Sequence, residues 1–196
     1  MKRMVILLAM ATGIAYGQAV NPDKGIREER KILEIEKIVK LTPNQRSTLA
    51  NGYKEYLEAL DSSVYKISDA DIAVSVKYKA NKAFHELLMS TLKDKQRIEY
   101  IQKTSKPEIE EKASYKMSLL AESGEYSEAE LQKMKEEIFN YLMLEKVVYV
   151  RDKFNVRKQK ENISRLKNLQ PRSLKESNIR EKQKGQGRIK NGKIQW

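Results

Sequence analysis

The chain has no cysteine among its 196 residues and only one histidine. Without cysteine it can form no disulfide, no thiol nucleophile and no zinc–thiolate site. The lone His85 is a poor metal site because metal ions in proteins are usually held by several such ligands, so we expect it at a partly exposed helix position. The stability of the fold must therefore come from the burial of apolar side chains.

The sequence patterns of known catalytic sites are missing as well. The chain has no glycine-rich phosphate loop and no Gly-x-Ser-x-Gly elbow. Its carboxylates lie on ordinary helix faces beside lysines, not in the apolar pocket that an acid–base pair needs; examples are Glu110, Glu111, Glu136 and Glu137. We therefore expect no enzymatic activity, no cofactor and no bound metal.

The amino terminus has the pattern of an export signal. Two basic residues precede an apolar run from Met4 to Ile14, which is shorter than the ~20 residues that span a bilayer. Ala15-Tyr16-Gly17 then supplies small residues at the positions that signal peptidase reads. We predict a signal peptide over 1–17 and a flexible leader over 18–25, with cleavage after Ala19 or an uncleaved anchor as alternatives. The mature protein would be periplasmic, or secreted.

Export changes the meaning of the strong positive charge. Basic residues exceed acidic ones by 12, and by 10 once Lys2 and Arg3 are removed with the signal peptide. In an exported protein this excess points to anionic envelope polymers, acidic lipid headgroups or negatively charged client chains. Nucleic acid is a less favoured partner, because no recognition motif accompanies the charge.

Apolar residues recur at helical spacing along most of the chain, which predicts an all-α fold of amphipathic helical hairpins. In the first half, 26–104, we expect a helix over 26–40, a second helix with an apolar stripe from Leu49 to Val64, and a third helix from about Ser68 to Ser90. The second and third helices should form an antiparallel pair. Gly52 costs the second helix up to ~1 kcal/mol, and it could allow a close helix approach or a bend.

The second helix begins at the stretch Leu41-Thr42-Pro43-Asn44-Gln45. The Thr42 hydroxyl can accept from the N–H of Gln45, and the Gln45 side chain can return the bond, which makes a capping box. Pro43 suits the first helical position, where its missing N–H costs nothing. These residues are explained by helix capping alone, so we expect a structural role for them.

A weaker copy of this pattern follows at Leu92-Lys93-Asp94-Lys95-Gln96, where lysine stands at the capping position. We therefore expect Ser90 or Thr91 to cap a short helix that ends near Thr104. Together the two starts resemble the LTxxQ-motif family of the Gram-negative periplasm, over about 32–103. The first motif matches at Leu41, Thr42 and Gln45, with the proline that often follows at Pro43; the second matches only at Leu92 and Gln96.

The resemblance implies an all-α, dimeric cradle whose surface holds partly unfolded client proteins without ATP, as in the Spy-like chaperones and envelope-stress proteins of that family. Its metal-resistance branch would need clusters of His, Met or carboxylate residues near the termini, and the sequence has none.

The second half, 105–170, departs from the family pattern. Ser105-Lys106-Pro107-Glu108 reads as a new helix start, and Ser127 with Glu130 as another capping box that opens a long apolar helix through Val150. Tyr126 should pack on Leu131 across the first turn of that helix. The two halves share too few identical residues to indicate a duplication.

The last segment, 171–196, has eight basic residues against two acidic ones and three glycines, so we predict a disordered basic tail. Its cations are candidate contacts for an anionic partner, with Trp196 as an apolar contact: Arg172, Lys175, Arg180, Lys182, Lys184, Arg188, Lys190 and Lys193.

Two functions are consistent with this sequence. The first is an ATP-independent periplasmic chaperone or envelope-stress protein that holds partly unfolded clients, using tyrosines, methionines and lysines as adaptable contacts. The second is a structural or adaptor protein of the cell envelope, which binds a fixed partner or an anionic surface through its long helix and basic tail.

Overall fold

The computed structural model describes residues 22–187, 189–190 and 193–194, and within them the fold is all-α, as predicted. A ladder of two-residue strands, β1 (Ile189–Lys190) and β2 (Lys193–Ile194), follows the last helix. The predicted signal peptide lies outside the described residues. The helices are α1 (Pro22–Glu36), α2 (Pro43–Tyr65), α3 (Ala70–Thr91), α4 (Asp94–Ala121), α5 (Glu128–Arg151), α6 (Val156–Lys167) and α7 (Arg172–Gly187).

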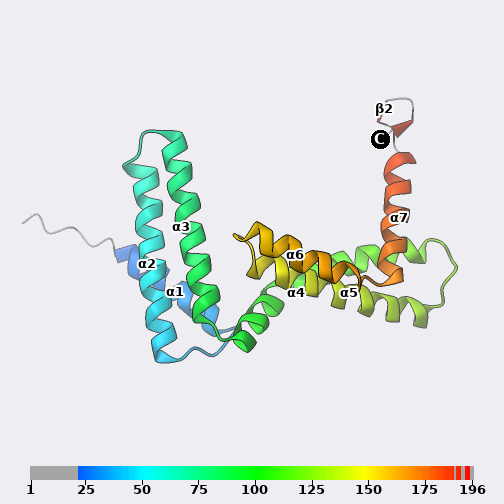
Figure 1. Ribbon diagram of the computed structural model, residues 1–196, viewed down its shortest axis with the longest axis horizontal. Helices are drawn as coiled ribbons and strands as arrows, with labels where there is room; N and C mark the ends of the chain where they lie inside the picture. Colours follow the sequence, from blue (N-terminus) through cyan, green and yellow to red (C-terminus); the bar gives the residue numbers. More distant parts are fainter. Residues whose placement is uncertain (1–21, 188, 191–192, 195–196) are drawn as a thin grey trace, which may run out of the picture.

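Helices α1 to α3 form an N-terminal unit around one apolar core (Figure 1). The first helix begins at Pro22, so the predicted flexible leader is wrong from that residue onward. Arg46 of α2 forms ion pairs with Glu29 and Glu36 of α1 and so fixes the two helices together. The core draws on all three helices and on the start of α4: Ile32, Ile35, Val39, Leu49, Leu88, Met89, Leu92 and Ile101.

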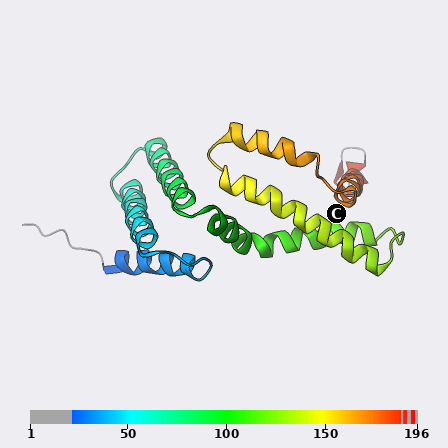
Figure 2. The same cartoon turned by 60° about the horizontal axis from the view of Figure 1, so that its bottom comes forward.

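Helices α2 and α3 pair as the predicted antiparallel hairpin, whose closed end projects away from the rest of the protein in both views (Figures 1 and 2). Gly52 lies against α3 with no room for a side chain, because a Cβ built there would meet Leu87 Cδ2 at 2.0 Å. Of the two roles that the sequence allowed for this glycine, the structure favours close approach.

The predicted boundary at residues 104 and 105 is wrong, because α4 runs unbroken through Pro107. Proline removes one helical hydrogen bond and costs about 3 kcal/mol in a helix interior. The cost is offset because one face of α4 stays buried both before and after Pro107. The buried residues follow at four-residue spacing: Ile101, Ser105, Ile109 and Ala113. Pro107 lies on the opposite, exposed face, and the helix changes direction along its length (Figure 2).

The rest of α4 packs with α5, α6 and α7 in a C-terminal unit. The predicted capping box at Ser127 is confirmed, since the Ser127 hydroxyl accepts from the Glu130 N–H and the Glu130 carboxylate accepts from the Ser127 N–H at 2.8 Å. Tyr126 and Leu131 both pack against the second core, which places them near the start of α5 where the predicted contact between them would form. The buried members of this core are Ala113, Leu120, Ile138, Tyr141 and Leu174.

The predicted disordered tail is wrong for residues 172–187, which form α7. Leu174 is only 3% exposed in the second core, and Ser177 is fully buried with its hydroxyl bonded to the Leu174 carbonyl at 2.9 Å. On the neighbouring face, Lys116 of α4 donates to Asn178 at 2.7 Å and to Glu181 at 2.6 Å. Apolar burial and ion pairing together hold a helix that its composition disfavours.

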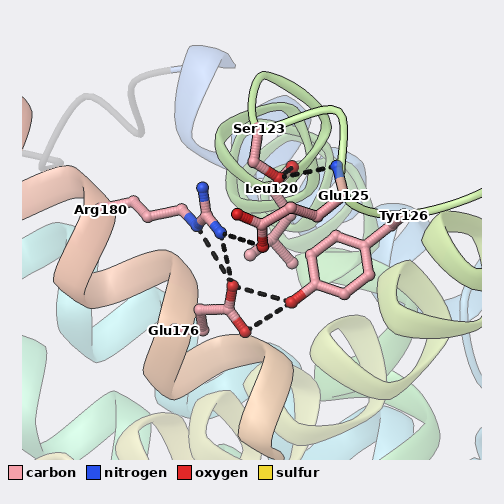
Figure 3. A network of polar contacts seen from close by, with 6 residues as sticks. All are labelled: Leu120, Ser123, Glu125, Tyr126, Glu176 and Arg180. Atoms are coloured by element: carbon pink, nitrogen blue, oxygen red, sulfur yellow. Dashed lines mark hydrogen bonds and ion pairs between the residues drawn. The ribbon is translucent and has the colours of Figure 1, made fainter.

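A network of charged groups ties α7 to the α4–α5 turn (Figure 3). The Tyr126 hydroxyl lies 2.7 and 2.8 Å from the two Glu176 carboxylate oxygens, and Arg180 donates to Glu176 at 2.7 Å and to Glu125 at 3.0 Å. The hydrogen bonds from Arg180 and Tyr126 hold the pKa of Glu176 below its ordinary value. The hydrogen bond to Glu176 likewise raises the pKa of Tyr126.

Glu108 connects α4 to α5 and should make the stability depend on pH. Its carboxylate accepts from Lys112 and from Lys146 of α5, both at 2.6 Å, and these bonds lower its pKa from 4.5 to about 2. The contribution is therefore complete above pH 4.5 and is lost as the pH falls towards 2. Because the side chain is half exposed, we expect Glu108→Gln to cost less than about 1 kcal/mol at neutral pH.

Urea unfolding of both proteins between pH 2 and 7 tests this, and the difference should vanish near pH 2. Glu110→Gln is the matched control, because Glu110 pairs only with Lys106 of the same helix. Equal pH profiles for the wild type and Glu108→Gln would contradict the assigned role.

Within the described part of the chain, no helix is both long enough and apolar enough to cross a membrane.

Candidate functional site

The first motif forms the capping box that its sequence predicts. Thr42 has extended backbone angles and lies directly before α2, with Pro43 at the first helical position. The Thr42 hydroxyl accepts from the Gln45 N–H at 3.3 Å, and Gln45 Oε1 accepts from the Thr42 N–H at 3.0 Å. Leu41, just before the cap, packs against the first core.

The second motif caps its helix by half of the same arrangement. Gln96 Oε1 accepts from the Lys93 N–H at 3.0 Å, but the Lys93 side chain has no acceptor for the return bond. The expectation that Ser90 or Thr91 caps α4 is wrong: both belong to α3, and the Ser90 hydroxyl donates to the carbonyl of Leu87. Lysine is tolerated at position 93 because the Gln96 side chain makes further hydrogen bonds that hold this helix start in place.

Those other bonds join the two motifs to each other. Gln45 Nε2 donates to Gln96 Oε1 at 2.9 Å, and Gln96 Nε2 lies 3.3 Å from Gln45 Oε1. The remaining amide protons reach backbone carbonyls across the junction, from Gln45 to Thr91 at 2.8 Å and from Gln96 to Lys40 at 2.6 Å. We call this pair of side chains the glutamine clasp. It fastens the start of α2 to the α3–α4 connection.

Leu92, the remaining motif residue, is buried in the first core at the same junction. All six motif positions are thus brought together at the base of the α2–α3 hairpin. Local spacing predicted each cap separately, and it gave no sign that the two glutamines meet.

Comparison of the chain with known family models, with curated proteins and with solved structures returned no match. The likeness to the LTxxQ-motif family therefore rests on the motif residues alone. The described residues also hold no group of three or more His, Asp or Glu side chains arranged to bind a metal ion.

Between α2 and α3 the clasped hairpin has an apolar groove of about 450 Å³. Three aromatic rings lie in contact at this position, with centroid separations of 5.4 Å for Tyr53–Tyr56, 5.1 Å for Tyr53–Phe84 and 5.8 Å for Tyr56–Phe84. Burial raises the pKa of Tyr53 above the ordinary value for a phenol. The groove is lined mainly by small and apolar side chains, among them Gly52, Ala59, Val76, Ala80, Ala83 and Leu87.

Four large apolar side chains at the closed end of the hairpin are exposed, and we call them the hairpin tip: Val64, Tyr65, Ile72 and Val74. Tyr65 is 82% exposed and each of the others more than half exposed. Scattered apolar residues are normal on protein surfaces, whereas these four belong to the same end of one hairpin.

The eight cations proposed as partner contacts are not equivalent in the structure. Arg180 is held by Glu176 and Glu125, and Lys184 pairs with Glu122, so these two side chains stabilise the fold. Arg172, Lys175 and Lys182 lie exposed on α7. Arg188 lies outside the described residues, as does Trp196. Lys190 and Lys193 pair through their backbones in β1 and β2.

Proposed function

We propose that this protein is an exported, ATP-independent chaperone that holds partly unfolded clients on its α2–α3 hairpin. The observation that carries the proposal is the glutamine clasp. It joins the two motif copies, and together they hold the base of a hairpin that exposes apolar side chains. No catalytic chemistry is part of this proposal. Periplasmic localisation belongs to it, through the predicted signal peptide.

The shape of the protein supports this function. The helices form an open arrangement and not a closed bundle (Figures 1 and 2). The hairpin tip and the apolar groove between α2 and α3 offer apolar surface without a fixed hydrogen-bond pattern, which suits clients of varied sequence. Cations elsewhere on the surface would keep the loaded protein soluble and attract acidic segments.

A light-scattering assay of client aggregation, without ATP, tests the proposal. The mature protein should suppress aggregation of several unrelated clients at near-stoichiometric amounts. Substituting all four residues of the hairpin tip by serine should raise the half-maximal concentration roughly tenfold, because about 1.4 kcal/mol of apolar burial would be lost.

The matched control is Leu144→Ser with Tyr149→Ser, which removes exposed apolar side chains from α5. It should leave suppression unchanged. Equal loss in both variants, or no suppression by the wild type with any client, would contradict the proposal.

An adaptor role in the cell envelope is the second candidate, favoured by the exposed cations Arg172, Lys175 and Lys182 on α7. An adaptor would recover one specific partner in a pull-down and would not protect unrelated clients. Its binding to an anionic surface would also weaken as the salt concentration rises.

A further inference from the structure

A pocket separate from the hairpin lies where α3, the first turn of α4 and the α5–α6 connection meet, and its volume is about 340 Å³. We call it the corner pocket. Phe154 forms part of its wall and contacts two aromatic side chains of α3, at 5.3 Å from His85 and 5.7 Å from Tyr78 between ring centroids. The residues that line the pocket include His85, Met89, Arg97, Arg151, Asp152 and Lys158.

Positive charge dominates this lining. Arg97, Arg151 and Lys158 face two acids, of which Asp152 is already engaged. Its carboxylate is 3% exposed and accepts two hydrogen bonds from Arg151, at 2.8 and 3.1 Å, and one from Asn162 at 2.8 Å. Burial alone would raise the pKa of Asp152, but these bonds and the charges of Arg151 and Lys158 outweigh it and hold the pKa low.

The second acid, Glu86, is exposed and lies 3.9 Å from Lys82 on its own helix. Lys153 adds a further cation beside Phe154. The first turn of α6, capped by Asn155, also borders the pocket, and a helix N-terminus carries partial positive charge. The field inside the pocket therefore favours an anion.

Two lining side chains have buried nitrogen atoms without a hydrogen-bond partner among the described residues, Arg97 Nε and His85 Nε2. Burial lowers the pKa of the His85 imidazole, and the backbone of Val150 only partly opposes this shift. A buried polar group left unpaired costs about 1–3 kcal/mol. The rest of the Arg97 guanidinium is held in place, because Nη2 donates to the Leu92 carbonyl at 3.0 Å and Nη1 lies 3.4 Å from the Asp94 carboxylate. A ligand that reached Arg97 Nε or His85 Nε2 would displace no existing hydrogen bond at these two atoms.

We propose that the corner pocket binds a small organic molecule through its phosphate or carboxylate group. Guanidinium groups bind such oxyanions through paired hydrogen bonds, and Arg97 Nε–H is an unused donor for one. Lys158 supplies a second charge, and its ion pair with Asp152 is long, at 3.8 Å. The pocket is larger than a single oxyanion requires, and Phe154 and Met89 offer an apolar wall for the attached carbon skeleton.

Isothermal titration of the mature protein with inorganic phosphate, glycerol 3-phosphate and succinate tests the proposal, in buffers matched in ionic strength with sodium chloride. We expect saturable binding of at least one of the three compounds. Comparing the two phosphates with succinate shows whether the pocket binds a phosphate or a carboxylate group. Lys158→Gln and Arg97→Lys should each raise the Kd about tenfold, the usual loss for one charged hydrogen bond.

Arg157→Gln is the matched control, because Arg157 is adjacent to Lys158, is 91% exposed and pairs with Glu161 outside the pocket. It should leave the Kd within about twofold, since an exposed pair contributes little. Thermal melting without ligand checks that each variant is folded. No saturable binding by the folded wild type, or equal weakening by Arg157→Gln, would overturn the proposal. Neither result bears on client holding by the hairpin.

Discussion

Leu174→Ala should lower the free energy of unfolding by about 2–4 kcal/mol, because Leu174 is the one side chain of α7 in the second apolar core. The substitution would leave a cavity in the core that also contains Leu120 and Ile138, and it would remove the buried apolar side chain of this helix. Because α7 is the last of the described helices, it should also separate from α4 more often in this variant than in the wild type. Urea unfolding measures the first effect, and hydrogen exchange of residues 172–184 the second.

Ile179→Ala is the control on the same helix, since Ile179 is more than half exposed. It should change stability by no more than about 0.5 kcal/mol. If amide protons of 172–184 exchange at the unprotected rate in the wild type as well, α7 is not docked and the predicted disordered tail is correct after all.

Gln45→Ala should cost about 2–3 kcal/mol, more than the loss of an ordinary helix cap. It removes the bond to the Thr42 N–H, leaves the Thr91 carbonyl without its donor at a largely buried junction, and removes the contact with the Gln96 amide. Thr42→Ala removes only the local cap and should cost about 1 kcal/mol. Chemical denaturation of both variants gives the comparison.

A double-mutant cycle with Gln96→Ala isolates the contact between the two glutamines. The double variant should be more stable than additivity predicts, by about 0.5–1.5 kcal/mol, because each single change already breaks the clasp. Gln132→Ala, at an exposed glutamine of α5, should be nearly neutral. Strict additivity at positions 45 and 96 would show that the two amides act independently.

The sequence was sufficient to predict features governed by neighbouring residues. The caps at Thr42 and Ser127 and the antiparallel hairpin follow from spacings of three or four residues, which decide helix starts and faces. The small residue at Gly52 likewise indicated a close approach, and the structure places Leu87 against it.

Predictions failed where tertiary burial outweighed a local preference. Ser105 and Pro107 have the composition of a helix start, yet the buried face that continues from Ile101 to Ile109 keeps α4 intact. That four-residue spacing was visible in the sequence and would have predicted the continuous helix. In α7, one leucine and ion pairs to α4 and to the α4–α5 turn outweigh a composition typical of disorder, and no local pattern shows which charges will meet.

The candidate sites were predictable to different degrees. Capping chemistry identified Gln45 and Gln96, but their contact joins positions 51 residues apart and depends on how α3 returns to the base of the hairpin. The corner pocket combines residues from α3, α4 and the α5–α6 connection, none of which belongs to a recognisable motif.

The order of the two cores along the chain has a consequence for folding kinetics. Every buried member of the first core precedes residue 102, so the N-terminal unit can close once the first turns of α4 are available. Most packed helices are also neighbours in sequence, an arrangement of low contact order that folds in microseconds to milliseconds. Helix α7 packs on α4 across the intervening α5 and α6, and we expect it to dock only after α5 has paired with α4.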